Sequence, residues 1–323
     1  MGIKRGLSNR FLEAGKIKIG GKGPLKKSAK GNDYRPPVKF GHFVITTTRR
    51  DMETGNLIID KKIMDALIAE AGPEPKEIRI RLPFDDIDMN FFTEFQYYVG
   101  KKCVCHGNGE SAERTGQDGV TKHVECDPGK CEFLADKKCK PTGILSCFLP
   151  YSKDLGGIYR FRTHSWNSVS GILSALTYIS AQTGGILQGL PLKLVLLKKS
   201  ITDHGNVDVV TIVVDGKGMA QMQQIAADLK KRRLELNIDI KRLEAQAASA
   251  GFLIDKDDPA DVEDEYYTRD VTPEPEKGTA PEDITASLRE KETPPNPTPE
   301  PETKTDPKPA PGGKEEGDGR ELF

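Results

Sequence analysis

Four cysteines that lie close together in the sequence have the residue type and spacing of a metal site. They are Cys105, Cys126, Cys131 and Cys139, and the first opens a Cys-His-Gly-Asn-Gly segment that favours a tight turn. Four thiolates complete the tetrahedral shell of a structural zinc and leave no position for a catalytic water. A short, loop-rich insert buries little apolar surface, so a metal would supply the order that it lacks. The sequence therefore predicts one structural zinc ion bound by these four residues.

Two alternatives to zinc remain open, namely disulfides and unpaired structural cysteines. Six cysteines are an even number, but the N-terminal segment has no apolar run typical of a secretory signal, which favours a reducing compartment. We expect the cytoplasm of a bacterial host cell. Only one of Cys103 and Cys105 is expected to bind the metal, and we select Cys105 because it adjoins the glycine turn. His106 and His123 are substitute ligands if one cysteine is not used.

Two other groups of residues could do chemistry, and each also has a structural explanation. His164 precedes Ser165, but neighbouring residues on a strand point to opposite faces, so Ser165 is better explained as a helix cap. Asp85, Asp86 and Asp88 could bind a divalent ion, although no His or further carboxylate follows at helical spacing, and a solvated turn is favoured. No phosphate-binding loop, HExxH or dinucleotide-binding glycine motif is present. The sequence indicates a protein that is not an enzyme.

Charge is distributed unevenly along the 323 residues. The segment 255–323 is rich in Pro and Glu and carries 21 Asp plus Glu against 9 Lys plus Arg, a net charge of −12. Since the whole chain has a formal charge of −1, the remainder carries +11. We expect the acidic segment to be disordered, and we expect residues 1–39 to form a basic, flexible arm. A basic body with an acidic tail fits a protein that works near nucleic acid, although the tail could serve solubility alone.

Residue periodicity predicts an α+β body over residues 40–254, with a cysteine insert at 103–140. Alternating apolar residues predict strands in a mixed or antiparallel sheet, and the turn Asp203-His-Gly-Asn206 favours a hairpin. Helices are expected from Asp60 to Gly72 and from Ser165 to Gly184. The expected strands lie near residues 43–47, 78–82, 144–149, 158–161, 192–197 and 207–214.

A long C-terminal helix is expected over residues 219–250. Met222, Leu229, Leu236 and Leu243 recur every seven residues, which is typical of a coiled-coil seam or of a long helix laid across a body. The two arrangements imply different oligomeric states, and both stay open.

Several segments, in this order, resemble the recombination directionality factors of phages that use large serine integrases. This family is also labelled hydrolase or metal-binding protein. The resemblance extends from residue 8 to about residue 215. The matching segments are Arg10-Phe-Leu-Glu-Ala-Gly-Lys-Ile-Lys-Ile-Gly, Lys76-Glu-Ile-Arg-Ile-Arg-Leu-Pro-Phe-Asp-Asp, Cys105-His-Gly-Asn-Gly-Glu-Ser-Ala-Glu-Arg114 with the later cysteines, and Gly157-Ile-Tyr-Arg-Phe-Arg-Thr-His-Ser-Trp-Asn-Ser168.

The resemblance implies a non-catalytic phage or prophage protein that binds a serine integrase and favours excision over integration. It implies contact with DNA, directly or through the integrase, and no membrane. Two other functions stay open: a zinc-stabilised DNA-binding phage protein and a metal-dependent hydrolase.

Overall fold

The computed structural model describes most of the chain between residues 12 and 249. Residues 1–11 of the expected arm and the whole acidic segment 255–323 lie outside the described residues. No helix in the described part is long and apolar enough to cross a membrane. The described ranges are 12–27, 33–53, 55–99, 102–116, 118–136, 138–152, 157–201, 205–216 and 218–249.

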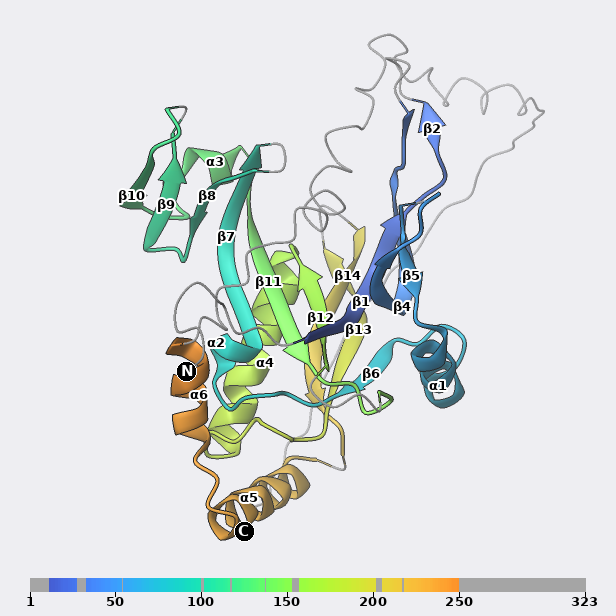
Figure 1. Ribbon diagram of the computed structural model, residues 1–323, viewed down its shortest axis with the longest axis vertical. Coiled ribbons are helices and arrows are strands. Elements are labelled where there is room, and N and C mark those ends of the chain that lie inside the picture. The colour runs from blue at the N-terminus through green and yellow to red at the C-terminus, as the bar shows by residue number, and fades with distance from the viewer. Residues whose placement is uncertain are drawn as a thin grey trace, which may run out of the picture. The chain divides into compact units, whose positions relative to one another are not determined.

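A nine-stranded mixed sheet is the larger of the two main sheets (Figure 1). Its strands are β1 (Leu12–Lys22), β4 (Pro37–Arg50), β5 (Leu57–Ile59), β7 (Phe91–Val99), β8 (Lys102–Gly107), β9 (Ser111–Thr115), β10 (Thr121–Glu125), β11 (Cys139–Cys147) and β12 (Gly157–Thr163). They lie in the order β10-β9-β8-β7-β11-β12-β1-β4-β5. The pair β1–β12 is parallel, and the other neighbouring strands of this sheet are antiparallel.

The expectation of a flexible arm over residues 1–39 is wrong for the described part of that segment. Strand β1 lies inside the nine-stranded sheet, where it pairs with both β12 and β4. Ile17 is fully buried, and buried Lys16 is neutralised by Glu13 at 3.3 Å. A Cβ on Gly15 would lie 2.1 Å from the carbonyl oxygen of Thr46, so the close approach of β4 requires glycine there. Within β1, Lys16 and Lys18 alternate with Ile17 and Ile19, as residues on opposite faces of a strand do.

A three-stranded antiparallel sheet, in the order β14-β13-β6, forms a second layer. It contains β6 (Glu77–Ile80), β13 (Leu192–Ile201) and β14 (Gly205–Val214), and a separate short hairpin joins β2 (Lys26–Lys27) to β3 (Asp33–Tyr34). Backbone hydrogen bonds in both directions between Arg81 and Phe148, at 3.0 and 2.8 Å, connect the ends of β6 and β11 and so join the two main sheets. The expected hairpin of β13 and β14 is confirmed, although its turn residues 202–204 lie outside the described part.

Six helices occur in the described part of the chain: α1 (Lys61–Ala71), α2 (Ile87–Asn90), α3 (Glu132–Ala135), α4 (Trp166–Gln182), α5 (Met219–Glu235) and α6 (Ile240–Ser249). Both predicted N-caps are confirmed. The Asp60 carboxylate accepts a hydrogen bond from the Ile63 N–H at 3.2 Å, and the Ser165 hydroxyl accepts one from the Ser168 N–H at 3.4 Å. Gly72 follows α1 with a positive φ of 86°, which glycine adopts without strain.

The expectation of one long helix over residues 219–250 is also wrong, because the chain forms two helices there. Asn237 adopts a left-handed conformation with φ of 55° after the end of α5. The Ile238 N–H donates to the Arg233 carbonyl at 2.8 Å, and the Asn237 N–H donates to Leu234 at 3.1 Å. These two bonds form a Schellman motif, which ends a helix by satisfying its last carbonyls. Asp239 then caps α6 by accepting from the Arg242 N–H at 3.0 Å.

One hydrophobic core joins the two main sheets to α1, α4 and α5. The Phe43 and Phe161 rings meet edge to face with their centroids 6.4 Å apart. The α+β class with a mixed sheet is therefore confirmed, including all six expected strand positions. Core residues come from the nine-stranded sheet (Ile17, Phe43, Ile45, Leu145, Phe161), the three-stranded sheet (Ile78, Ile80, Leu192, Leu194, Val210), and the helices (Leu67, Ile172, Leu176, Met222).

Candidate functional site

Strand register places Cys105 and Cys139 on the same face of the nine-stranded sheet. Cys105 of β8 and Cys139 of β11 each lie directly opposite Tyr97 of β7, the strand between them. Directly opposed residues of antiparallel strands share a face. We call the face that carries Cys105, Tyr97 and Cys139 the cysteine face. Both thiols are buried there.

The segment that carries Cys126 and Cys131 packs over the cysteine face. Phe133 of α3 stacks on Tyr97 with ring centroids 4.9 Å apart. The guanidinium carbon of Arg114 lies 4.6 Å from the centroid of the same Phe133 ring, so this ring contacts both an aromatic ring and a cation. Cys131 is the N-cap residue of α3, and Cys126 continues from β10 by donating its N–H to Glu110 at 2.9 Å. The structure therefore gathers all four predicted ligands around one patch of sheet.

The four thiols interact electrostatically but do not form a finished coordination shell. Burial, and then the neighbouring thiols of Cys131, Cys105 and Cys126, raise the pKa of Cys139 to about 12. Among the described residues, no three His, Cys, Asp or Glu side chains converge closely enough to hold a metal ion. Cys105 and Cys139 are separated by the strand β7, because Tyr97 of β7 lies between them. All six cysteines are free thiols, and no disulfide joins them.

Cys103 points away from the cysteine face because β8 contains a bulge. Its partner on β7 is Tyr98, whereas the partner of Cys105 is Tyr97, so Val104 is the extra residue. Adjacent residues of β7 face opposite sides of the sheet, and the two cysteines follow them. Burial, followed by the charge of Glu94, raises the pKa of Cys103 to about 11. The selection of Cys105 over Cys103 is consistent with this register.

The two histidines considered as substitute ligands lie on the face opposite the cysteines. His106 pairs with Gln96 and Glu113, and Glu113 pairs with His123, so all four residues share that face. His106 Nδ1 lies 3.4 Å from Glu94, and His123 Nε2 lies 3.8 Å from Glu113. Burial raises the pKa of Glu94, while His106 opposes that rise. With the sheet between them and the thiols, these histidines cannot complete the same shell.

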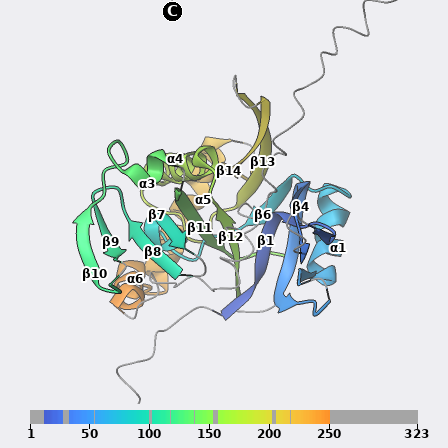
Figure 2. The same cartoon turned by 90° about the horizontal axis from the view of Figure 1, so that it is seen from above.

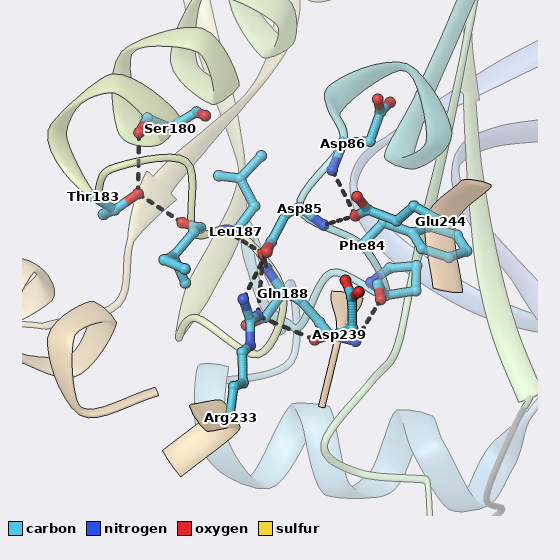
Figure 3. A network of polar contacts seen from close by, with 12 residues as sticks. Phe84, Asp85, Asp86, Ser180, Thr183, Leu187, Gln188, Arg233, Asp239 and Glu244 are labelled. Atoms are coloured by element: carbon cyan, nitrogen blue, oxygen red, sulfur yellow. Dashed lines mark hydrogen bonds and ion pairs between the residues drawn. The ribbon is translucent and has the colours of Figure 1, made fainter. Parts of the chain in front are cut away.

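The acidic group Asp85, Asp86 and Asp88 does not form a metal site. Asp85 Oδ1 accepts the backbone N–H groups of Leu187 at 2.9 Å and Gln188 at 2.8 Å, and the carboxylate also receives Arg233 (Figure 3). Asp86 caps α2 by accepting from the Met89 N–H at 2.9 Å. Two of the three carboxylates, those of Asp85 and Asp86, therefore accept hydrogen bonds from backbone N–H groups and hold the backbone in place.

The same network fastens the C-terminal helices to the loop after β6. Glu244 of α6 accepts the N–H groups of Asp85 at 2.7 Å and Asp86 at 3.0 Å, and Arg233 of α5 contacts Gln188 at 3.0 Å (Figure 3). Glu244 and Asp85 are 159 positions apart in sequence, and Arg233 and Gln188 are 45 apart. Periodicity in the sequence cannot reveal these contacts, because each partner belongs to a separate element.

His164 and Ser165 are also engaged in ways that explain them without catalysis. His164 Nδ1 lies 3.1 Å from the Thr142 hydroxyl, and the Ser165 hydroxyl caps α4. A nucleophile needs its base within hydrogen-bond reach, and here each side chain has a different neighbour.

The stack of Tyr97, Phe133 and Arg114 was not identified from the sequence. Tyr97 belongs to an aromatic cluster, from Phe91 to Tyr98, and aromatic clusters commonly contribute to a hydrophobic core. In the structure, Phe91 is buried in that core, whereas Tyr97 supports the cysteine insert. One feature of the sequence could have indicated this stack. Phe133 lies between Cys131 and Cys139, and an apolar ring in a small insert needs a packing partner nearby.

One family model matches this chain, over residues 14–216. Its description is Gp3-like, recombination directionality factor-like. The match covers more than half of the 323 residues, nearly all of both main sheets and the whole of α4, and it ends before α5 begins. No curated protein and no solved structure matches the chain. The chain belongs to the Gp3-like family of recombination directionality factor-like proteins.

Proposed function

We propose that this chain binds a large serine integrase and favours excision over integration. The observation that carries the proposal is the family match over residues 14–216. The match spans both main sheets, α1, α4 and the cysteine insert, so the proposal rests on most of the body of the protein and not on one short motif.

The candidate catalytic residues make structural hydrogen bonds, which supports a protein that acts by binding a partner. Asp85 and Asp86 hold backbone N–H groups, and Ser165 caps a helix. A directionality factor of this kind makes and breaks no bond itself, because the integrase supplies the chemistry.

Differential binding is sufficient for such control. A protein that binds one integrase–DNA arrangement about 1.4 kcal/mol more tightly than another shifts their ratio about tenfold. If it binds both arrangements equally, it shifts nothing, however tight the binding. The proposal therefore requires a surface that distinguishes two arrangements of the integrase.

The test is a recombination assay with a large serine integrase encoded in the same genome. Added protein is expected to promote recombination between the left and right hybrid sites and to reduce recombination between the original attachment sites. An integrase whose reactions are unaffected, and which does not co-purify with this chain, contradicts the proposal. Binding of this chain to DNA without integrase would then favour the zinc-stabilised DNA-binding protein.

We also propose that a structural zinc ion completes the cysteine insert. Cys105, Cys126, Cys131 and Cys139 are the ligands, on the argument that they surround one buried patch and are soft donors of the number that structural zinc takes. Binding would require Cys126 and Cys131 to move towards the two strand cysteines. A closed shell of this kind would stabilise the insert and would take no part in a reaction.

A further inference from the structure

Helix α4 is a surface helix without a single charged residue. Its sequence, WNSVSGILSALTYISAQ, has no Asp, Glu, Lys or Arg over 17 residues. Since 30% of the chain is charged, a segment of this length would be expected to carry about five such residues. Solvent-facing sides of helices are normally charged or polar, so this composition needs an explanation.

The outer face of α4 combines large apolar and aromatic side chains with small hydroxyl residues. Trp166 is 53% exposed and Tyr178 is 57% exposed, with Leu173 between them along the helix. Ser170, Ser174 and Thr177 fill the remaining positions of that face and are also exposed. Tryptophan and tyrosine dominate the binding energy of protein interfaces, and interface centres are depleted in charge. We call the face formed by these six residues the α4 face.

The opposite side of α4 is fixed to the body, so the α4 face is held in place before any partner arrives. Ile172, Leu176 and Ile179 enter the core. The Ser168 hydroxyl accepts the Val210 N–H at 3.0 Å, and the Thr211 hydroxyl donates to the Gly171 carbonyl at 3.2 Å, which anchors α4 to β14 (Figure 2). A preformed surface loses little conformational entropy on binding.

Trp166 is also supported by the sheet that carries the cysteine insert. Its ring centroid lies 5.4 Å from that of Phe95, on β7. Phe95 alternates with Tyr97 along β7, so Trp166 lies over the cysteine face at the edge of the insert. The exposed indole is therefore packed on one side and open on the other, which is the arrangement of an interface anchor.

We propose that the α4 face is the surface that binds the serine integrase, an inference that rests on the function proposed above. Charge decides the class of partner. Nucleic acid is bound through Lys and Arg at phosphates, and α4 has neither. A charged protein surface would lose hydration here without gaining an ion pair. The matching surface on the integrase is therefore apolar and uncharged.

The boundary of the family match favours α4 over the exposed apolar residues of α5 and α6. Leu234, Leu236, Ile238 and Leu243 are exposed where α5 meets α6, and we call them the elbow group. That group lies beyond residue 216, outside the family match, whereas α4 lies wholly within it. A function common to the family belongs to a surface within the match.

The single tryptophan of the chain allows a direct test. Protein labelled with 5-fluorotryptophan carries one ¹⁹F resonance, at Trp166. Addition of unlabelled integrase is expected to change the chemical shift of that resonance as the indole leaves water. A chemical shift that stays unchanged while the two proteins form a complex overturns the inference and leaves the proposed function standing.

Variants provide the second test, with affinity for the integrase as the readout. Trp166→Ala and Tyr178→Lys are each expected to weaken binding at least tenfold, with melting temperature and circular dichroism showing that the fold is retained. Leu236→Ser and Leu243→Ser alter the elbow group at similar exposure and are expected to leave affinity unchanged. Loss of binding in the elbow variants alone contradicts the inference.

Two other outcomes separate this inference from its premise. If the unaltered protein neither binds the integrase nor changes its reactions, the proposed function fails and the inference fails with it. If the protein forms a dimer that Tyr178→Lys converts to a monomer while integrase binding persists, a second copy covers the α4 face and the inference is overturned.

Discussion

Arg233 on α5 and Asp85 in the loop after β6 form a two-bond ion pair across 148 residues of sequence. Arg233 Nη1 lies 2.6 Å from Asp85 Oδ2, and Nη2 lies 3.1 Å from Oδ1. Only 12% and 17% of the two side chains are exposed, so little water screens the pair. Because Asp85 lies within the family match and Arg233 lies outside it, the pair joins α5 to the matched part of the chain.

Replacing Arg233 by alanine is expected to lower the free energy of unfolding by about 3 kcal/mol, since it leaves a mostly buried carboxylate without its cation. Urea denaturation of the purified variant measures the change. Lys231→Ala is the matched control, because Lys231 makes an exposed pair with Glu235 at 4.0 Å. That control should change stability by less than about 0.5 kcal/mol. Equal effects of the two substitutions would show that the Arg233 pair is not specially stabilising.

Two small substitutions of Asn237 are expected to affect the stability of the protein differently. Its φ of 55° is the left-handed conformation that ends α5, and glycine adopts this conformation without the clash of a Cβ. Asn237→Gly should leave stability unchanged or raise it slightly, whereas Asn237→Ala should lower it by about 1 kcal/mol. Thermal unfolding of both variants tests the prediction. A single continuous helix would reverse the order, because alanine is the better helix former.

The elements whose signals are local could be predicted from the sequence. Asp60 and Ser165 cap their helices as expected, and the alternation of Ile78 with Ile80 marks a buried strand. Features that depend on distant partners could not be predicted. Lysines in β1 suggested an arm, because nothing local shows that β12 and β4 lie on either side of it. The break at Asn237 interrupts a sevenfold pattern that, on its own, favours continuation.

In the candidate site, too, local features could be predicted from the sequence and features that depend on distant partners could not. The sequence could group the four cysteines by type and spacing, and strand pairing places Cys105 and Cys139 on one face. The bulge at Val104 and the stack of Phe133 on Tyr97 have no local signature. The exclusion of His106 and His123 from the cysteine face likewise depends on the register between β7, β8, β9 and β10.

Zinc content is expected to be one ion per chain in protein purified without added metal. The double substitution Cys126→Ser/Cys131→Ser should abolish binding and lower the melting temperature, since the insert then loses the bond that orders it. Cys103→Ser is the control, because Cys103 points to the other face and should leave the zinc content unchanged. Elemental analysis measures all three proteins. Unchanged zinc in the double variant would show that other residues bind it.

Thiol reactivity is expected to depend on metal at Cys126 and Cys131 but not at Cys147. Burial raises the pKa of Cys147 to about 12, so at pH 8 roughly one molecule in ten thousand carries the reactive thiolate. The pKa of Cys139, also raised to about 12, predicts equally slow reaction. Cys126 and Cys131 are only half-buried and should react first with iodoacetamide once a chelator has removed the metal.

Mass spectrometry of tryptic peptides, with and without the chelator, measures this order of alkylation. Metal should slow modification of Cys126 and Cys131, because a thiolate bound to zinc is a poorer nucleophile and is held away from the reagent. Cys147 serves as the internal control and should be modified only on unfolding in either sample. Equal rates at Cys126 and Cys131 in both samples would contradict zinc binding, whereas rapid modification of Cys147 would contradict its burial in the core at the end of β11.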